Sequence, residues 1–238
     1  MTGIFYGVGV GPGDPELLTL KAIHTIKKAD VIIAPQTEKK SESVALSICR
    51  PYIHENTKIV KMKFPMVFCA TTLSNAWQEN KDIILNFLQE GKKVVFLTLG
   101  DPMLYSTYIY VFRLLKDCGY PVHTIPGIPA FCAISSYIGY PMAEGDNIVS
   151  ILPATADEEV MDKVLAVSDN VVLMKVYKNF KEVIGKLEDN GLLENAVMVS
   201  KCGLAGEQIV HNLKEVDEKV NYLSTILTRK CKENSCQK

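Results

Sequence analysis

The 238-residue sequence predicts an α/β fold made of two domains. Short, continuous apolar runs alternate with segments of helical spacing along the first half. This alternation is typical of a parallel sheet covered by helices on both faces. Two of the runs end in glycine-rich turns, at residues 9–13 and 100–103. Apolar residues make up 47% of the chain and charged residues 22%, which favours a folded core over disorder.

Strands and helices alternate in the first domain, which we expect to span residues 1–127 and to carry a glycine-rich loop. The predicted strands cover residues 4–10, 30–35, 58–64, 92–102 and 121–127. The predicted helices cover residues 15–29, 41–53, 71–91 and 104–119. Asp14 can cap the first helix and Pro15 suits its first position, while Gly91 ends the third helix. Ligands of such sheets bind outside the carboxyl ends of the strands, so both glycine-rich turns are candidate sites.

The second α/β domain is expected at residues 128–238. Its predicted strands cover residues 147–154, 169–179, 195–203 and 221–230, and its predicted helices cover residues 157–167 and 180–191. The uncharged stretch 118–143 is long enough to cross a bilayer, but four prolines interrupt it. We therefore expect no membrane span. The N-terminus lacks a basic segment followed by an apolar one, so we also expect no signal peptide and a soluble, cytoplasmic protein.

Charge and cysteine usage exclude several classes of protein. The formal net charge of −1 gives no basic excess, so we expect no nucleic-acid partner. The seven cysteines are scattered and form no CxxC pair, which argues against a disulfide scaffold and against a metal site. Cys231 and Cys236 lie in a polar tail that we expect to fray.

The first glycine-rich turn does not fit the known phosphate-binding motifs. Counted from Gly9, the sixth position is Asp14, where the dinucleotide fingerprint requires glycine or alanine. The chain also lacks the Walker pattern. What remains is a rigid glycine–proline turn whose exposed N–H groups could accept carboxylates or phosphates. A tight strand–helix turn without a ligand explains the same residues.

Three motifs in order along the chain narrow the choice. They are GVGVGPGDPELLTLKA (7–22), VVFLTLGDPMLYST (94–107) and IPGIPAF (125–131). Together they resemble the tetrapyrrole methylase family, and the resemblance continues to GEQIV (206–210). It implies two α/β domains of this type, with the active site in the cleft between them. It also implies S-adenosylmethionine as methyl donor, a tetrapyrrole substrate and a homodimer.

Further segments resemble one branch of this family. KFPM (63–66), Trp77 and GYPMAEGDNIVSILPA (139–154) are similar to enzymes that methylate C20 of precorrin-2 or cobalt-factor II in cobalamin biosynthesis. Siblings acting on uroporphyrinogen usually show GGDP followed by FGR, where this chain has Leu99 before Gly100 and Tyr105-Ser106-Thr107. A sibling methylase for uroporphyrinogen III C2/C7 or precorrin-4 C11 stays an alternative. A non-catalytic binding module and an RNA methylase of the same fold stay open as well.

The resemblance also implies site residues. Cofactor contacts are implied for Leu99, Gly100, Asp101, Met103, Ser106, Thr107, Pro129, Ala130, Lys175, Val176 and Gly203. Met174, Lys201, Cys202, Ser224 and Thr225 are weaker candidates. Substrate contacts are implied for Gly9, Gly11, Pro12, Gly13 and Asp14.

Individual roles follow from the chemistry of these residues. Gly100 would let the backbone approach the ligand. The Asp101 carboxylate would accept bonds from the cofactor's amino group, and Ser106 and Thr107 would bind the ligand or cap the helix that follows. Relatives often carry Thr or Ser where this chain has Pro129 and Ala130, which leaves backbone contacts there. The electron-rich macrocycle is itself the nucleophile, so no catalytic triad is implied. The base that would accept the C20 proton is unknown at this point.

Overall fold

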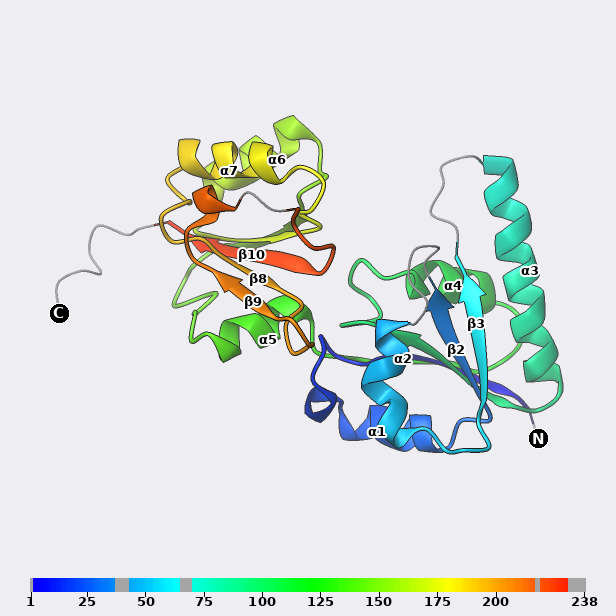
Figure 1. The fold of residues 1–238 in the computed structure, drawn as a ribbon. Helices are drawn as coiled ribbons and strands as arrows, with labels where there is room; N and C mark the ends of the chain where they lie inside the picture. Colours follow the sequence, from blue (N-terminus) through cyan, green and yellow to red (C-terminus); the bar gives the residue numbers. More distant parts are fainter. Residues whose placement is uncertain (1, 37–42, 65–69, 217–218, 231–238) are drawn as a thin grey trace. The chain divides into compact units, whose positions relative to one another are not determined.

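The computed structural model describes residues 2–36, 43–64, 70–216 and 219–230. The chain divides into two compact units, Met1–Pro129 and Ala130–Lys238. Each unit has its own five-stranded sheet (Figure 1). The predicted two-part α/β fold is thereby confirmed at the level of fold class.

The first unit has a parallel sheet, as its continuous apolar strands predict. Its strands are β1 (Ile4–Gly9), β2 (Val31–Gln36), β3 (Lys58–Lys63), β4 (Lys93–Thr98) and β5 (Val122–Ile125). Its helices are α1 (Leu20–Lys27), α2 (Val44–Cys49), α3 (Ala70–Gln89) and α4 (Tyr108–Leu115), with 3₁₀ turns η1 (Pro15–Leu17) and η2 (Arg50–Tyr52). The strand order is β3-β2-β4-β1-β5, and every pairing is parallel.

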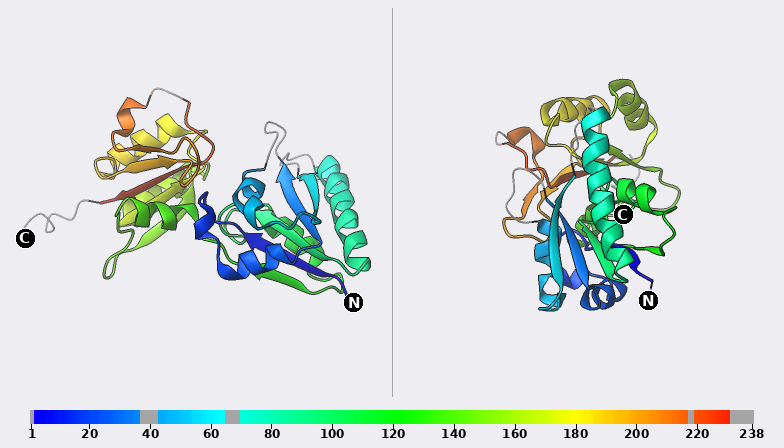
Figure 2. Two further views of the ribbon diagram at one scale, coloured as in Figure 1. Left: turned by 60° about the horizontal axis from the view of Figure 1, so that its bottom comes forward. Right: turned by 90° about the vertical axis from the view of Figure 1, so that its right-hand side faces the viewer.

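This strand order creates a switch point between β1 and β4. The connections after β1 and β2 lead toward one edge of the sheet, and those after β3 and β4 lead toward the other. Right-handed crossovers then place α1 and α2 on one face and α3 and α4 on the opposite face (Figure 1, Figure 2). Neighbouring strands whose chains leave in opposite directions open a crevice at their carboxyl ends, where ligands of open α/β sheets bind.

Aromatic side chains fill the layer between this sheet and α3 and α4. The Phe5 ring lies parallel to the Tyr108 ring at 6.3 Å between centroids and tilted to the Phe96 ring at 6.4 Å. Ile84 and Leu88 of α3 are buried against them. Because this layer holds Tyr108 at the start of α4, it also fixes the segment that leads from β4 into α4.

One predicted helix, residues 15–29, is split in two. Asp14 caps only the short turn η1, through a bond from the Glu16 N–H to its Oδ1 at 2.8 Å. Leu18 then adopts an extended conformation. The Thr19 hydroxyl accepts the Ala22 N–H at 3.1 Å and begins α1 one turn later than predicted. A second capping residue inside the apolar period therefore overrides the single-helix pattern.

The second unit has a mixed sheet of order β6-β7-β10-β8-β9. Its elements are α5 (Ala130–Tyr137), β6 (Val149–Pro153), α6 (Glu158–Val167), β7 (Asn170–Met174), α7 (Phe180–Asp189), β8 (Val197–Ser200), β9 (Gln208–Val210), η3 (Leu213–Glu215) and β10 (Ser224–Arg229). Only β6 and β7 pair in parallel. Strand β9 was not predicted, since three largely exposed residues carry no clear alternation.

Helices α6 and α7 bury the core of this unit against one face of its sheet. Met161 and Leu165 of α6 and Leu187 of α7 lie in one buried cluster with Leu173 and Ile226 of the strands. The Asp157 carboxylate caps α6 by accepting the Glu159 and Val160 N–H groups. Among the described residues, no helix has both the length and the apolar character needed to cross a membrane.

Candidate functional site

Three loops come together at the carboxyl edge of the first sheet. They follow β1, β4 and β5, which are adjacent strands. The Val10 N–H donates to the Thr98 carbonyl at 2.9 Å. The Gly100 N–H donates to the Gly11 carbonyl at 2.8 Å, and this pair forms an isolated antiparallel bridge. The two glycine-rich turns singled out in the sequence are therefore in direct contact at the switch point.

Two glycines at this junction are required by packing. A Cβ placed on Gly9 would lie 2.6 Å from the Gly100 carbonyl oxygen and 2.6 Å from the Gly127 nitrogen. A Cβ on Gly127 would collide with the Gly100 carbonyl oxygen and with the backbone of Gly9. Real Cβ atoms do not approach backbone atoms this closely, so neither position accepts a side chain without displacing a neighbouring loop.

Gly100 differs, because its missing side chain faces open space. Its φ of 68° lies in the left-handed region, which glycine adopts without a steric penalty. The nearest atom to a Cβ placed there is the Pro129 Cα, at 3.9 Å. Among the described residues other than its chain neighbours, no atom except the Pro129 Cα lies within 4 Å of a Cβ at this position. There is therefore room for a ligand beside the Gly100 backbone, and the predicted cofactor contact there stays a prediction. This open approach is the feature of the described residues that fits a bound cofactor.

Asp101 links two of the loops through its carboxylate. Its Oδ1 accepts the Met103 N–H at 2.8 Å, and its Oδ2 accepts the Gly127 N–H at 3.1 Å. The sequence assigns this carboxylate to the cofactor's amino group. A carboxylate has about four lone-pair sites, so the two backbone bonds leave acceptor capacity for a ligand. Asp101 thus holds the loops after β4 and β5 together in this structure.

Ser106 faces the interior of the first unit. It is buried, and its Oγ lies 2.7 Å from the Thr98 Oγ1. It also accepts the Tyr108 N–H at 3.1 Å, which supports the first turn of α4. The sequence leaves open whether Ser106 binds the ligand or caps the helix that follows, and these bonds correspond to capping. Thr107 occupies the N-cap position without a side-chain capping bond.

Tyr105 adopts a conformation that the sequence does not predict. Its φ of 49° lies in the left-handed region, which costs a residue with a side chain about 1–2 kcal/mol. The side chain is 42% exposed, and that of the nearby Met103 is 47% exposed. No sequence signal marks such a residue, because the strain is imposed by the anchors on either side, Asp101 and Ser106.

The β1 loop is less accessible than the sequence predicts. Gly11, Pro12 and Gly13 are buried, and the Gly11 carbonyl is used in the bridge to Gly100. Gly11 has a φ of 75°, which makes glycine the suitable residue for this turn. Asp14, at the end of the loop, is partly exposed and caps η1.

The candidates of the second unit gather at one edge of its sheet. Strands β6, β7 and β8 end there, and β10 begins there, with Thr225 opposite Met174 and Ser224 opposite Ser200. Lys175 and Lys201 follow β7 and β8 with φ values of 59° and 54°. The chain therefore turns sharply after both strands, as it does at Gly100 and Tyr105 in the first unit.

Val176 and Gly203, two further candidates in this unit, differ in burial and in hydrogen bonding. Val176 is fully buried in the core cluster, main chain and side chain alike, so neither part of it is exposed to a ligand in this structure. The Gly203 N–H donates to the Glu207 carboxylate at 2.6 Å, and its φ of 71° suits glycine. Ala130 begins α5, and Leu99 immediately precedes Gly100.

Two buried cysteines of the described residues, Cys49 and Cys202, have thiols with raised pKa values. Burial, and then the charge of Glu207, raise the pKa of Cys202 to about 11. Burial raises the pKa of Cys49 to about 12. Both thiols are therefore protonated at neutral pH. Over the described part of the chain, no group of histidine, cysteine and acidic residues is arranged to bind a metal. Cys69, Cys231 and Cys236 lie outside the described residues.

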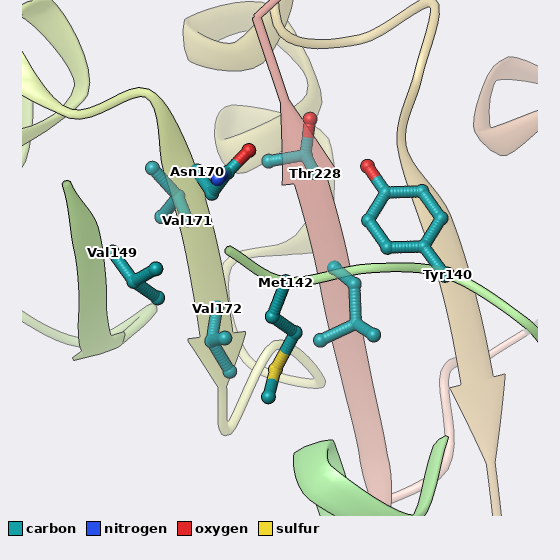
Figure 3. A pocket seen from close by; sticks show the side chains of 8 residues that line it. Tyr140, Met142, Val149, Asn170, Val171, Val172 and Thr228 are labelled. Carbon is teal, nitrogen blue, oxygen red and sulfur yellow. The ribbon is translucent and has the colours of Figure 1, made fainter. Parts of the chain in front are cut away.

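A shallow recess in the second unit has none of the predicted site residues among its lining residues. It encloses no volume large enough for a water molecule, and apolar side chains such as Met142, Val149 and Val172 line it (Figure 3). The Tyr140 hydroxyl at its rim already donates to the Asn195 carbonyl at 2.7 Å. Because no cation is among its lining residues, it does not match a ligand that carries many carboxylates.

Comparison with known proteins gives concordant results. Residues 5–217 match the family described as Tetrapyrrole (Corrin/Porphyrin) Methylases. The cobalt-precorrin-2 C(20)-methyltransferase of Salmonella typhimurium is 37% identical over 234 residues, covering 97% of this chain and 98% of that protein. A probable cobalt-precorrin-2 C(20)-methyltransferase of Methanocaldococcus jannaschii is 33% identical over 232 residues, covering 95% and 96%.

Among solved structures, the chain is similar to uroporphyrin-III C-methyl transferase from Thermus thermophilus, complexed with S-adenyl homocysteine. The TM-score is 0.69 at 20% identity, over 95% of this chain and 97% of that chain. At this identity the likeness concerns the fold.

Proposed function

The chain belongs to the tetrapyrrole methylase family, and from this premise we propose that it is a C20-methyltransferase of cobalamin biosynthesis. Its methyl donor is S-adenosylmethionine, and its acceptor is precorrin-2 or the cobalt-containing form, cobalt-factor II. The observation that carries this proposal is the 37% identity, over nearly the full length of both chains, to a protein named cobalt-precorrin-2 C(20)-methyltransferase. The names of both relatives favour the cobalt-containing acceptor.

The open backbone at Gly100 supports the proposed cofactor site. Leu99, Gly100 and Asp101 would contact the cofactor, with Met103, Thr107, Pro129 and Ala130 around them. On the second unit, the backbones of Lys175 and Gly203 are the proposed contacts, and the buried Val176 follows Lys175 in the chain. The β1 loop from Gly9 to Asp14 is the proposed substrate contact. Ser106 supports the site from the interior, through its bonds to Thr98 and Tyr108.

The proposed chemistry places modest demands on the side chains. When bound, S-adenosylmethionine would supply an activated methyl group, and C20 of the electron-rich macrocycle would be the nucleophile. The transfer would break the sulfur–methyl bond, release S-adenosylhomocysteine and pass the C20 proton to water or to a basic group. The residues of the chain hold the two reactants in line and exclude water, an effect that can lower the barrier by about 7–11 kcal/mol. The protonated thiols of Cys49 and Cys202 agree with a reaction that needs no protein nucleophile.

The proposal extends to a homodimeric enzyme in the cytoplasm, as the family resemblance implies. Light scattering on the purified protein tests the dimer directly, since a mass of about twice the 26.4 kDa chain is expected.

Incubation with methyl-labelled S-adenosylmethionine tests the reaction. Precorrin-2 and cobalt-factor II are supplied in parallel, and mass spectrometry and NMR locate the new methyl group. We expect S-adenosylhomocysteine and a single labelled methyl at C20. A methyl at C2, C7 or C11 would assign the chain to a sibling activity. Cofactor binding without any transfer to either acceptor would contradict the proposal and indicate a binding module.

A further inference from the structure

We propose that Tyr105 is a substrate-binding residue whose ring lies against one face of the tetrapyrrole macrocycle. This inference rests on the proposed function, because it names a contact for that acceptor. Tyr105 lies within the motif VVFLTLGDPMLYST (94–107), but it is not among the predicted site residues. The inference starts from its backbone and its exposure.

The backbone at Tyr105 is held in place from both sides. Before it, the Asp101 carboxylate binds the Met103 N–H, and the Leu104 N–H lies 3.5 Å from the Asp101 carbonyl. After it, the buried Ser106 binds Thr98 and the Tyr108 N–H. The loop therefore keeps Tyr105 at a φ of 49° although a tyrosine does not favour this conformation. Strain that the surroundings maintain in this way is concentrated at functional sites.

The exposure of Tyr105 also supports a role in substrate binding. The next aromatic residue of this segment, Tyr108, is fully buried, and its hydroxyl lies 2.7 Å from the Thr124 Oγ1. Tyr105, by contrast, is 42% exposed and Met103 is 47% exposed, so both residues keep a large surface that a ligand can contact. Both lie at the carboxyl end of β4, beside the switch point where ligands of such sheets bind.

The chemistry of the ring suits the acceptor. A tetrapyrrole presents a flat, conjugated face and a rim of carboxylates. A tyrosine ring stacks on such a face in an offset arrangement and adds no anion that would repel the rim. Burial raises the pKa of Tyr105, so the phenol stays neutral at the pH of the cell. An acidic residue in the same place would be unfavourable.

A glycine variant removes the ring and relieves the strain together. Because glycine adopts a φ of 49° freely, we expect Tyr105→Gly to unfold within about 4 °C of the wild type. Its dissociation constant for cobalt-factor II, followed by absorbance, is expected to rise about tenfold or more. Its dissociation constant for S-adenosylmethionine, measured by calorimetry, is expected to stay within about twofold of the wild type.

Two matched variants complete the test. Tyr105→Phe keeps the ring and is expected to bind cobalt-factor II as the wild type does. Tyr110→Ala removes a tyrosine that is also exposed, at 50%, but packs on Trp77 with 5.7 Å between ring centroids, and it is expected to change neither constant.

Different results separate this inference from the proposed function. Wild-type affinity for cobalt-factor II in Tyr105→Gly would overturn the inference alone, and so would a Tyr105→Phe variant as weak as Tyr105→Gly. A wild-type protein that binds no cobalt-factor II would overturn the inference and contradict the proposed function as well.

Discussion

Asp101 shows how one carboxylate combines a structural role with a proposed binding role. Its two oxygens hold the Met103 and Gly127 N–H groups, which belong to loops after different strands. The sequence identifies Asp101 through the GDP motif that it shares with a family. It cannot identify the bond to Gly127, because the two residues are 26 positions apart and only the fold brings them together.

Replacing Asp101 with alanine is expected to weaken S-adenosylmethionine binding. The variant loses a charged acceptor and both backbone bonds, so the dissociation constant measured by calorimetry should rise about tenfold or more. Asp101→Asn keeps one acceptor oxygen and should lie between the two. The control is Asp117→Ala, since the Asp117 side chain is 84% exposed and pairs only loosely with Lys116, at 3.8 Å. Unchanged affinity in a folded Asp101→Ala protein would refute the proposed role.

Tyr105, Lys175 and Lys201 show where residue-level prediction stops. All three have positive φ values, and none is a glycine or an asparagine. The sequence assigns Lys175 to the site only by resemblance and does not select Tyr105. Left-handed conformations of large residues come from tertiary anchors such as Ser106, so the local sequence carries no signal for them.

At the scale of elements, the strands and helices are predicted by their apolar spacing, and their ends are less well predicted. The strand predicted over 92–102 ends at Thr98, and the one predicted over 169–179 ends at Met174. Both end where the backbone turns into the left-handed region, at Gly100 and at Lys175. These turns place the carboxyl ends of the strands next to the candidate residues.

The junction of the three loops in the first unit depends on glycines. Gly127→Ala is expected to destabilise the protein by about 1–3 kcal/mol or more, because its Cβ must displace the Gly100 carbonyl or the Gly9 backbone. Urea denaturation measures this loss. The same substitution at Gly185 is the control. No atom lies within 4 Å of a Cβ there, and alanine is expected to stabilise α7 by about 0.5–1 kcal/mol.

Comparing the stability of Gly127→Ala with that of Gly185→Ala separates the steric effect of an added Cβ from the effect of replacing glycine by alanine in general. If Gly127→Ala were as stable as the wild type, the three loops would not pack as tightly as described. Displacing Gly127 also removes its bond to Asp101, so the affinity for S-adenosylmethionine is expected to fall in this variant and to stay unchanged in Gly185→Ala.

At the scale of the whole molecule, the chain consists of two units, each with its own sheet and core. The parallel sheet of the first unit follows from its continuous apolar strands. The mixed sheet of the second does not, because the direction of β10 depends on long connections that carry no periodic signal. A methyl transfer to a reactive macrocycle needs no catalytic triad, so no such triad can be recognised in the sequence. The activity is predicted instead from three motifs that follow one another along the chain.

The central claim is that the bend at Gly100 and Asp101 holds the methyl donor. A crystal structure of the protein grown with S-adenosylmethionine tests it most directly. We expect the cofactor to lie against the exposed backbone of Gly100, beside Pro129, with its amino group near the Asp101 carboxylate. Clear density for the cofactor at another place, with the backbone of Gly100 uncovered, would contradict the account.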